Sequence, residues 1–308
     1  MKKVSVLIAC FNAEKYIQQC LRSLFVQSLD DYEIIIVDDG STDSTVVKIQ
    51  DAIKGQDNVF FFPREENLGT IKTRNELLKI SAHNSEFIAW CDADDVYHRN
   101  KLEIQYDFLK KNPEYIGCGT WYKKFGRVNK CVFKFVNAKA NAFFTCFGSP
   151  VGFPTFMQKN SPGVCFDERL DSGEDYAYVS ELAKLGHLTN IKKFLTYYRV
   201  HDAQESTQNI KRQRKVHDQV SAEMCKYYLA NQQNLYPFIS NPLISNENSL
   251  NDFILHLNEL EINNDKSLFV AIFDYRFLSY NKKNVKMLVK YSLRRNIKLI
   301  RILFLYLR

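Results

Sequence analysis

Long uncharged apolar runs are missing from this 308-residue chain. A membrane-spanning helix needs about 18 or more such residues in a row, and no stretch here approaches that length. Two lysines near the start precede an apolar run, but the run covers only residues 4–11 and no small-residue cleavage site follows it. We therefore expect neither a secretory signal peptide nor a membrane span in this sequence.

Closely spaced cysteine pairs are also absent. The eight cysteines are scattered along the chain without a Cys-x-x-Cys pair, and several of them fall inside apolar runs. This pattern predicts reduced core residues in a cytoplasmic protein. It also argues against cysteine as a metal ligand.

Glycine-rich phosphate-binding loops are a third absence. A dehydrogenase-type nucleotide-binding sheet has Gly-x-Gly-x-x-Gly after its first strand, but residues 10–14 here read Cys-Phe-Asn-Ala-Glu. The Walker phosphate loop is missing too. A bound phosphate would therefore not rest on a glycine-rich turn, which favours a metal ion for that task.

Short apolar runs are present, the second of them β-branched, and they alternate with helical patterns. We expect strands at residues 4–10, 33–37, 59–62 and 86–90. Helices are expected after the first three strands, with Asn12 capping the first helix and residues 70–82 forming the third. Alternating elements with short connections predict an α/β fold with a parallel, doubly wound sheet.

Two of the expected strands end in acidic residues. Asp38 and Asp39 follow the second strand, and Asp92, Asp94 and Asp95 follow the fourth. Ligands of open α/β sheets collect at the carboxyl ends of the strands, where gathered carboxylates repel each other unless a cation lies among them. Mg²⁺ and Mn²⁺ prefer such oxygen ligands. The alternative is a solvated acidic turn, and residues 92–95 alone do not decide between the two.

A series of motifs, in order, resembles the family 2 glycosyltransferases. The similarity covers roughly residues 3–207 and implies the GT-A fold, in which a nucleotide-binding α/β half precedes an acceptor-binding half. The motifs are Val-Ser-Val-Leu-Ile (4–8) with Phe11-Asn12, Glu-Ile-Ile-Ile-Val-Asp-Asp-Gly-Ser-Thr-Asp (33–43), Asn-Leu-Gly (67–69), Arg-Asn (74–75), Asp-Ala-Asp-Asp (92–95), Gly-Glu-Asp-Tyr (173–176) and Tyr-Arg-Val-His-Asp-Ala-Gln-Glu-Ser (198–206).

The resemblance implies a donor site for a nucleotide-diphosphate sugar. It places Asp38 and Asp39 at the base and ribose, Phe11 against the base, and Arg74 near the base or the phosphates. In the alternative interpretations, the two aspartates form the acidic first turn of a helix, and Arg74 belongs to a solvated helix face with two lysines.

The resemblance also implies a metal site for Mn²⁺ or Mg²⁺. It matches residues 92–94 to the Asp-x-Asp element, with Asp94 as the first ligand and Asp92 toward the ribose. Asp95 is a further or water-mediated partner of the metal. His201 is implied to face the metal and the diphosphate, with Arg199 behind it, and the alternative is a structural histidine.

Asp175 is the implied general base, which takes the proton from an acceptor hydroxyl, and Glu174 is its neighbour or an acceptor ligand. The alternative is that both acids only complement the dipole of a helix that begins there. The sequence departs from the family at residues 10–12, where many relatives have Pro and Tyr. It departs again at residues 152–155, where Gly-Phe-Pro-Thr replaces a His-Pro-Thr element and leaves that acceptor-side contact open.

These features together predict an inverting, metal-dependent enzyme that transfers one sugar from a nucleotide-diphosphate sugar, first of all a UDP-sugar. The acceptor expected by family analogy is a growing glycan such as lipopolysaccharide or capsule. The Gln-x-x-Arg-Trp element of processive synthases is missing, which favours one sugar per encounter. The alternatives are a nucleotide-sugar-binding protein without turnover and a sugar nucleotidyltransferase, which would need a glycine- and base-rich loop after the first strand.

The two ends of the chain differ in charge and pattern. We expect a GT-A domain at residues 1–210 and a helical region at 211–308. From Arg276 onward there are ten Lys and Arg residues and no Asp or Glu. Such a basic amphipathic segment is expected to lie on an anionic membrane, at the inner face of the cytoplasmic membrane. The alternatives are a helix packed on the core and a nucleic-acid patch, although no nucleic-acid motif accompanies it.

Overall fold

The computed structural model describes residues 1–160, 163–202, 204 and 210–229. The chain falls into two compact units, one made of residues 1–141 and 149–216 and the other of residues 142–148 and 217–308. The predicted division at residues 210 and 211 stays a prediction, because most of the second region lies outside the described residues.

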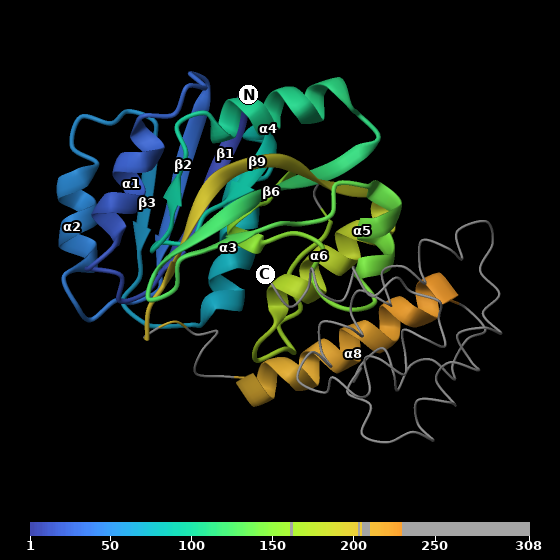
Figure 1. Ribbon diagram of the computed structural model, residues 1–308. Coiled ribbons are helices and arrows are strands. Elements are labelled where there is room, and N and C mark those ends of the chain that lie inside the picture. Colours follow the sequence, from blue (N-terminus) through green and yellow to red (C-terminus); the bar gives the residue numbers. More distant parts are fainter. Residues whose placement is uncertain (161–162, 203, 205–209, 230–308) are drawn as a thin grey trace. The chain divides into compact units, whose positions relative to one another are not determined.

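One mixed sheet forms the first unit, in the strand order β3-β2-β1-β4-β8-β6-β9-β5, with β7 paired to β6 (Figure 1). Its first four strands are parallel, as the sequence predicted. Those strands are β1 (Lys2–Cys10), β2 (Tyr32–Asp38), β3 (Val59–Pro63) and β4 (Ser85–Trp90).

Helices cover both faces of these parallel strands, because β2 sends alternate apolar side chains to opposite sides. Ile34 and Ile36 pack in one core cluster with side chains of α1 (Ile17–Phe25), α2 (Thr45–Ala52) and α4 (Lys101–Lys111). Ile35 and Val37 pack in a second cluster with side chains of α3 (Thr70–Ser81) and α6 (Glu174–Leu185). The predicted doubly wound α/β architecture is therefore confirmed.

The other strands of the sheet have mixed directions. β6 and β9 lie side by side and parallel over most of their length (Figure 1). β8 is antiparallel to both β4 and β6, β5 to β9, and β7 to β6. The bounds of these elements are β5 (Val96–Tyr97), β6 (Tyr115–Gly126), β7 (Lys130–Val132), η1 (Phe153–Thr155), β8 (Met157–Lys159) and β9 (His187–Val200).

The prediction that Asn12 caps the first helix is wrong. α1 begins only at Ile17. Asn12 has a φ of 48°, a left-handed conformation that asparagine adopts more readily than most residues. Its side-chain oxygen accepts the backbone N–H of Thr42 at 2.9 Å, and its own N–H donates to Ser41 Oγ at 2.8 Å. Asn12 therefore joins the loop after β1 to the loop after β2.

Helix α8 (Ile210–Leu229) provides the described C-terminal part of the second unit. Ser221 Oγ donates to the carbonyl of Cys146 at 2.5 Å, and His217 Nε2 lies 2.9 Å from the carbonyl oxygen of Phe147. Helix α5 spans Ala138–Phe144, shortly before Cys146 and Phe147. Among the residues that the structure describes, no helix has both the length and the apolar character needed to cross a bilayer. The basic segment from Arg276 onward lies outside those residues.

All eight cysteines are free, and six of them are buried, as predicted for core residues. Cys131 and Cys165 differ from this prediction, since both are exposed.

A buried lysine lies at the start of α4. Lys101 is 0% exposed, and its Nζ lacks a hydrogen-bond partner among the described residues. The ammonium lies 3.8 Å from the centre of the Tyr97 ring. Burial lowers the pKa of Lys101 to about 7, although Cys91, Cys118 and Asp95 act in the opposite direction. The folded chain thus loses this proton near neutrality, whereas the unfolded chain keeps it to about pH 10.4.

We therefore expect Lys101→Met to raise the free energy of unfolding, and to do so more at pH 6 than at pH 9. Between pH 7 and about 10 the unfolded state binds one proton more than the folded state. The free energy of unfolding of the wild type therefore rises by up to about 1.4 kcal/mol for each unit of increasing pH. The Met variant lacks this gain. Urea unfolding followed by tryptophan fluorescence measures it, with the half-exposed Lys110→Met as control. A difference between variant and wild type that does not change with pH would show the prediction to be wrong.

Candidate active site

Asp38 shapes the turn at the end of β2. Its carboxylate is buried and accepts the backbone N–H of Ser41 at 2.9 Å and the Ser41 hydroxyl at 2.5 Å. Helix α2 begins later, at Thr45, where Asp43 accepts the Thr45 N–H at 2.9 Å. The alternative that Asp38 and Asp39 form the acidic first turn of a helix is therefore wrong, because α2 begins six residues after Asp39.

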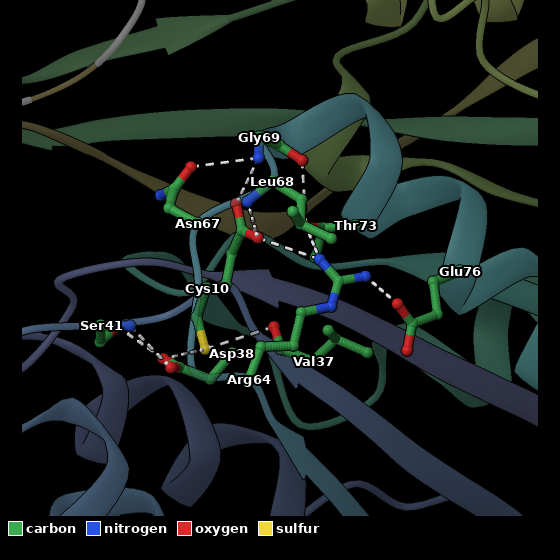
Figure 2. A network of polar contacts seen from close by, with 11 residues as sticks. Cys10, Val37, Asp38, Ser41, Arg64, Asn67, Leu68, Gly69, Thr73 and Glu76 are labelled. Carbon is green, nitrogen blue, oxygen red and sulfur yellow. Dashed lines mark hydrogen bonds and ion pairs between the residues drawn. The ribbon is translucent and has the colours of Figure 1, made fainter.

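Asp39, directly after β2, accepts hydrogen bonds from the loop that follows β3, whose residues Asn67, Leu68 and Gly69 are labelled in Figure 2. Its carboxylate accepts the backbone N–H groups of Leu68 and Gly69, each at 2.9 Å. Arg64 donates to the same carboxylate at 3.0 Å and forms a second ion pair with Glu76. Arg64 was not predicted, since no motif marks it in the sequence. The Asn-Leu-Gly motif is thus held against the end of β2 by a buried aspartate.

Glycine is required where these two loops meet. Gly40 has a φ of +71°, and a Cβ at this position would lie 2.6 Å from the backbone carbon of Glu66. Phe11 directly follows β1 at the same edge of the sheet, and its side chain is 48% exposed. The carboxyl ends of β1 and β2 therefore present an open aromatic ring beside two buried aspartates.

The loop after β4 brings Asp92, Asp94 and Asp95 together, with one carboxylate oxygen of each lying within 4.8 Å of the others. The Asp95 N–H donates to the Asp92 carbonyl at 3.2 Å and closes the turn. Asp95 is fully buried, so the three do not form a solvated turn. Burial raises the pKa of Asp92 to about 7, and Asp94, Asp175 and Glu174 add to the rise while Arg74 opposes it.

These three residues fit a hard divalent cation. Carboxylate oxygens are the ligands that Mg²⁺ and Mn²⁺ prefer. Oδ2 of Asp95 is buried and accepts no hydrogen bond from the described residues, so it has lone pairs to offer. Burial and the charges of Asp94 and Asp92 also raise the pKa of Asp95, the repulsion that a cation would relieve.

Arg74 joins the acidic loop to α6. Its Nη1 lies 2.5 Å from Glu174 Oε1, and its Nη2 lies 3.7 Å from Asp92 Oδ1. The guanidinium also lies 4.5 Å from the centre of the Phe153 ring. The Arg74 side chain is only 12% exposed, so the alternative of a solvated helix face is wrong for it. Phe153, at a position where the sequence departs from the family that it resembles, thus packs against the Arg74 guanidinium.

Asp175 lies beside this ion pair in the first turn of α6, as predicted. Gly173 precedes it with a φ of 69°, which turns the chain into the helix. Oδ1 of Asp175 accepts the backbone N–H of Tyr176 at 2.7 Å. Burial and the negative charge of Glu174 raise the pKa of Asp175, although Arg74 lowers it.

The end of β9 and the segment that follows it close the other side of the acidic loop. His201 Nε2 lies 2.9 Å from Asp94 Oδ2, and Gln204 donates to the same oxygen at 3.3 Å. Arg199 donates its Nε–H to the carbonyl of Asp94 at 2.8 Å and its backbone N–H to Asp95 Oδ1 at 2.8 Å. The structure therefore brings the last sequence motif directly onto the acidic loop.

Two residues on this side were missed. Gln204 lies inside the motif at 198–206, which was its only signal. Tyr16, directly before α1, belongs to no motif in the sequence, yet its ring lies 4.6 Å from the His201 ring and 4.7 Å from the Arg199 guanidinium.

Comparison with known proteins agrees with this geometry. Residues 5–157 match the sequence model of the family described as Glycosyl transferase family 2. A protein of Haemophilus influenzae named "Uncharacterized glycosyltransferase" is 26% identical over 242 residues, which cover 73% of this chain and 74% of that protein. Poly(ribitol-phosphate) beta-glucosyltransferase of Bacillus spizizenii is 31% identical over 185 residues, or 57% of this chain and 28% of that protein.

Solved structures show the same fold. S. aureus TarS 1-349 in complex with UDP-GlcNAc superposes with a TM-score of 0.59 at 19% identity, and the match covers 96% of this chain and 92% of that one. The mannosyltransferase PcManGT from Pyrobaculum calidifontis, in complex with GDP-Man and Mn²⁺, gives a TM-score of 0.57 at 13% identity over 97% and 82% of the two chains. The family match, the relatives and the GT-A fold together show that this chain belongs to the family 2 glycosyltransferases and is a glycosyltransferase.

Proposed function

We propose that the enzyme transfers a single sugar, with inversion, from a nucleotide-diphosphate sugar to a hydroxyl of a growing surface glycan such as lipopolysaccharide or capsule. The observation that carries this proposal is the Arg74 bridge, which joins Asp92 of the metal-type loop to Glu174 beside the expected base. A UDP-sugar is the first choice of donor, and the TarS structure with UDP-GlcNAc supports it. The B. spizizenii relative, a poly(ribitol-phosphate) glucosyltransferase by name, supports a surface polymer as acceptor.

The donor base would bind at the ends of β1 and β2. The half-exposed Phe11 ring offers it a stacking face. Asp38 and Asp39 already accept hydrogen bonds from the protein, but each carboxylate oxygen has two lone pairs and keeps acceptor capacity for the base and ribose. Asp39 also fixes the turn at residues 67–69. It would therefore both shape the site for the nucleotide base and contact that base.

The diphosphate would lie at the acidic loop. Asp94, with Asp92 and Asp95, would hold Mn²⁺ or Mg²⁺, and His201 would face the same group from the far side of Asp94. A bound divalent cation neutralises charge that develops on the leaving nucleoside diphosphate. The PcManGT structure with GDP-Man and Mn²⁺ supports a metal in this fold.

Asp175 fits the general base better than Glu174 does. Oε1 of Glu174 is engaged by Arg74, whereas burial raises the pKa of Asp175 toward the range of a base at neutral pH. In the proposed step, the acceptor oxygen bonds to the anomeric carbon as its proton passes to Asp175. The bond from that carbon to the diphosphate breaks at the same time, and the nucleoside diphosphate leaves from the opposite face.

Removal of one expected metal ligand should separate metal binding from folding. We expect Asp94→Asn to abolish transfer and the Mn²⁺-dependent thermal stabilisation by UDP-sugars, because an amide is a poorer ligand for a hard cation than a carboxylate. The unfolding temperature without ligand should change little. Asp51→Asn, a change at an exposed ion pair far along α2, is the matched control. Full wild-type activity in EDTA would contradict the metal role.

Removal of the base should leave donor binding intact. We expect Asp175→Asn to lower kcat by roughly 10²–10⁴-fold with unchanged UDP-sugar affinity. Wild-type turnover should fall as the pH drops through the raised pKa of Asp175, because only the ionised carboxylate accepts a proton. Steady-state kinetics across pH measures both effects. A loss with Glu174→Gln and none with Asp175→Asn would move the base by one residue.

The basic segment from Arg276 onward supports attachment to the inner face of the cytoplasmic membrane. Each base near an anionic lipid surface contributes about 1 kcal/mol. We expect the full chain to co-sediment with phosphatidylserine vesicles at low salt, and a variant with Lys290, Arg294, Lys298 and Arg301 changed to Gln to remain in the supernatant. Equal pelleting of both proteins, or pelleting that ignores salt, would contradict membrane attachment.

A further inference from the structure

Acidic residues disappear from the chain where its acceptor half begins. Residues 1–114 contain 19 Asp and Glu, but residues 115–166 contain none. The same 52 residues contain seven bases, namely Lys123, Lys124, Arg127, Lys130, Lys134, Lys139 and Lys159. β9, the neighbour of β6 in the sheet, also has no acid and adds Lys192, Lys193 and Arg199. Strands β6, β7 and β9 therefore form a sheet region with charge of only one sign.

Two of these lysines oppose each other directly. Lys124 of β6 pairs with Lys130 of β7 in antiparallel register, so both side chains lie on the same face of the sheet. Like charges at such a pair destabilise a sheet. The Lys124 ammonium lies 5.4 Å from the centre of the Tyr198 ring, and Lys130 is exposed. An anion bound between the two lysines would relieve their repulsion.

This face adjoins the active site. Tyr122 lies two residues before Lys124 on the same face, and its ring lies 5.9 Å from that of Tyr198. A Cβ on Gly152 would lie 2.9 Å from the Tyr122 ring, and Gly152 precedes the phenylalanine that supports Arg74. The face therefore leads from the lysine pair, past two tyrosines, to the site of transfer.

A third lysine of the acid-free segment, Lys134, acts on the expected base through its charge alone. Lys134 donates to the carbonyl of Ser149 at 3.0 Å, and its charge lowers the pKa of Asp175. Arg127, in contrast, is already paired with Asp202. The acid-free segment thus carries positive charge both at the paired strands β6 and β7 and within electrostatic range of Asp175.

We propose that the acceptor is a negatively charged glycan chain and that Lys124 and Lys130 bind one of its anionic groups. The inference rests on the proposed function, because it names the class of acceptor for the same site. A neutral glycan would leave the like-charged pair uncompensated. A chain with regularly spaced phosphates or carboxylates places one group at the lysines while another unit offers its hydroxyl to Asp175.

Binding without turnover tests this. Fluorescently labelled glycerol-phosphate oligomer, oligogalacturonate and neutral dextran of similar length are titrated with the full chain, and fluorescence anisotropy is followed at two salt concentrations. We expect one or both anionic probes to bind, more weakly at high salt, and dextran not to bind. Lys124→Gln with Lys130→Gln should weaken the anionic probe by roughly tenfold or more, the loss of about one charge-assisted hydrogen bond.

Control variants separate charge at this site from net charge and from folding. Lys54→Gln with Lys79→Gln removes two exposed lysines elsewhere and should leave binding unchanged. Lys124→Arg should retain binding, because the positive charge is kept. Stabilisation by a UDP-sugar, measured in each variant, reports an intact donor site, so failure of the metal or base assignments is distinguishable from failure here.

Three results would overturn the inference. Dextran could bind as tightly as the anionic probes, or the Lys124/Lys130 double variant could bind them as the wild type does. A DNA oligonucleotide of equal charge, or phosphatidylserine vesicles, could also compete for the lysine pair more strongly than either anionic glycan does. The surface would then serve another partner.

Discussion

Repulsion among carboxylates at one edge of the sheet is the constraint on which the rest of the site depends. The loop after β4 and the first turn of α6 bring five acids together, and burial together with their mutual charge raises the pKa of Asp92, Asp95 and Asp175. Arg74 offsets this charge on one side through Asp92 and Glu174. On the other side, Asp95 accepts a hydrogen bond from Arg199 at the end of β9, and Asp94 accepts one from Gln204 in the segment that follows. We propose that a divalent cation and a diphosphate bind between these two sides.

The fold supplies the positions that make this arrangement possible. Parallel strands β1, β2 and β4 end at the same edge, so the loops that follow them meet although they are far apart in sequence. Asp39 fastens the loop after β3 to the end of β2, and α3 begins directly after that loop and carries Arg74. The long strand β9 returns the chain to the acidic loop. The buried Asp39 carboxylate thus positions the Asn-Leu-Gly motif, the start of α3 positions Arg74, and the end of β9 positions the last motif.

The sequence predicted the parts of the site that have a local signal. Apolar runs marked β1 to β4, and the acidic clusters marked the ends of β2 and β4. The pairings of Arg64 with Asp39 and of Gln204 with Asp94 join residues far apart in the sequence and had no such signal. The like-charged pair Lys124 and Lys130 is close in sequence, but it follows only from the register of β6 and β7. Asn12 shows the limit of a local rule, since its preference for helix caps was overridden by a left-handed turn. Phe153 lies where many members of the family have histidine, and its ring packs against the Arg74 guanidinium.

Diffraction from crystals grown with Mn²⁺ and a UDP-sugar, measured at a wavelength where manganese scatters anomalously, tests the central claim most directly. The account predicts one anomalous peak among the carboxylates of Asp92, Asp94 and Asp95. The diphosphate should contact the manganese ion at that peak, and Arg74 should still be paired with Glu174. A bound nucleotide with no peak at these residues, its diphosphate held by Arg74 in place of Glu174, would contradict it.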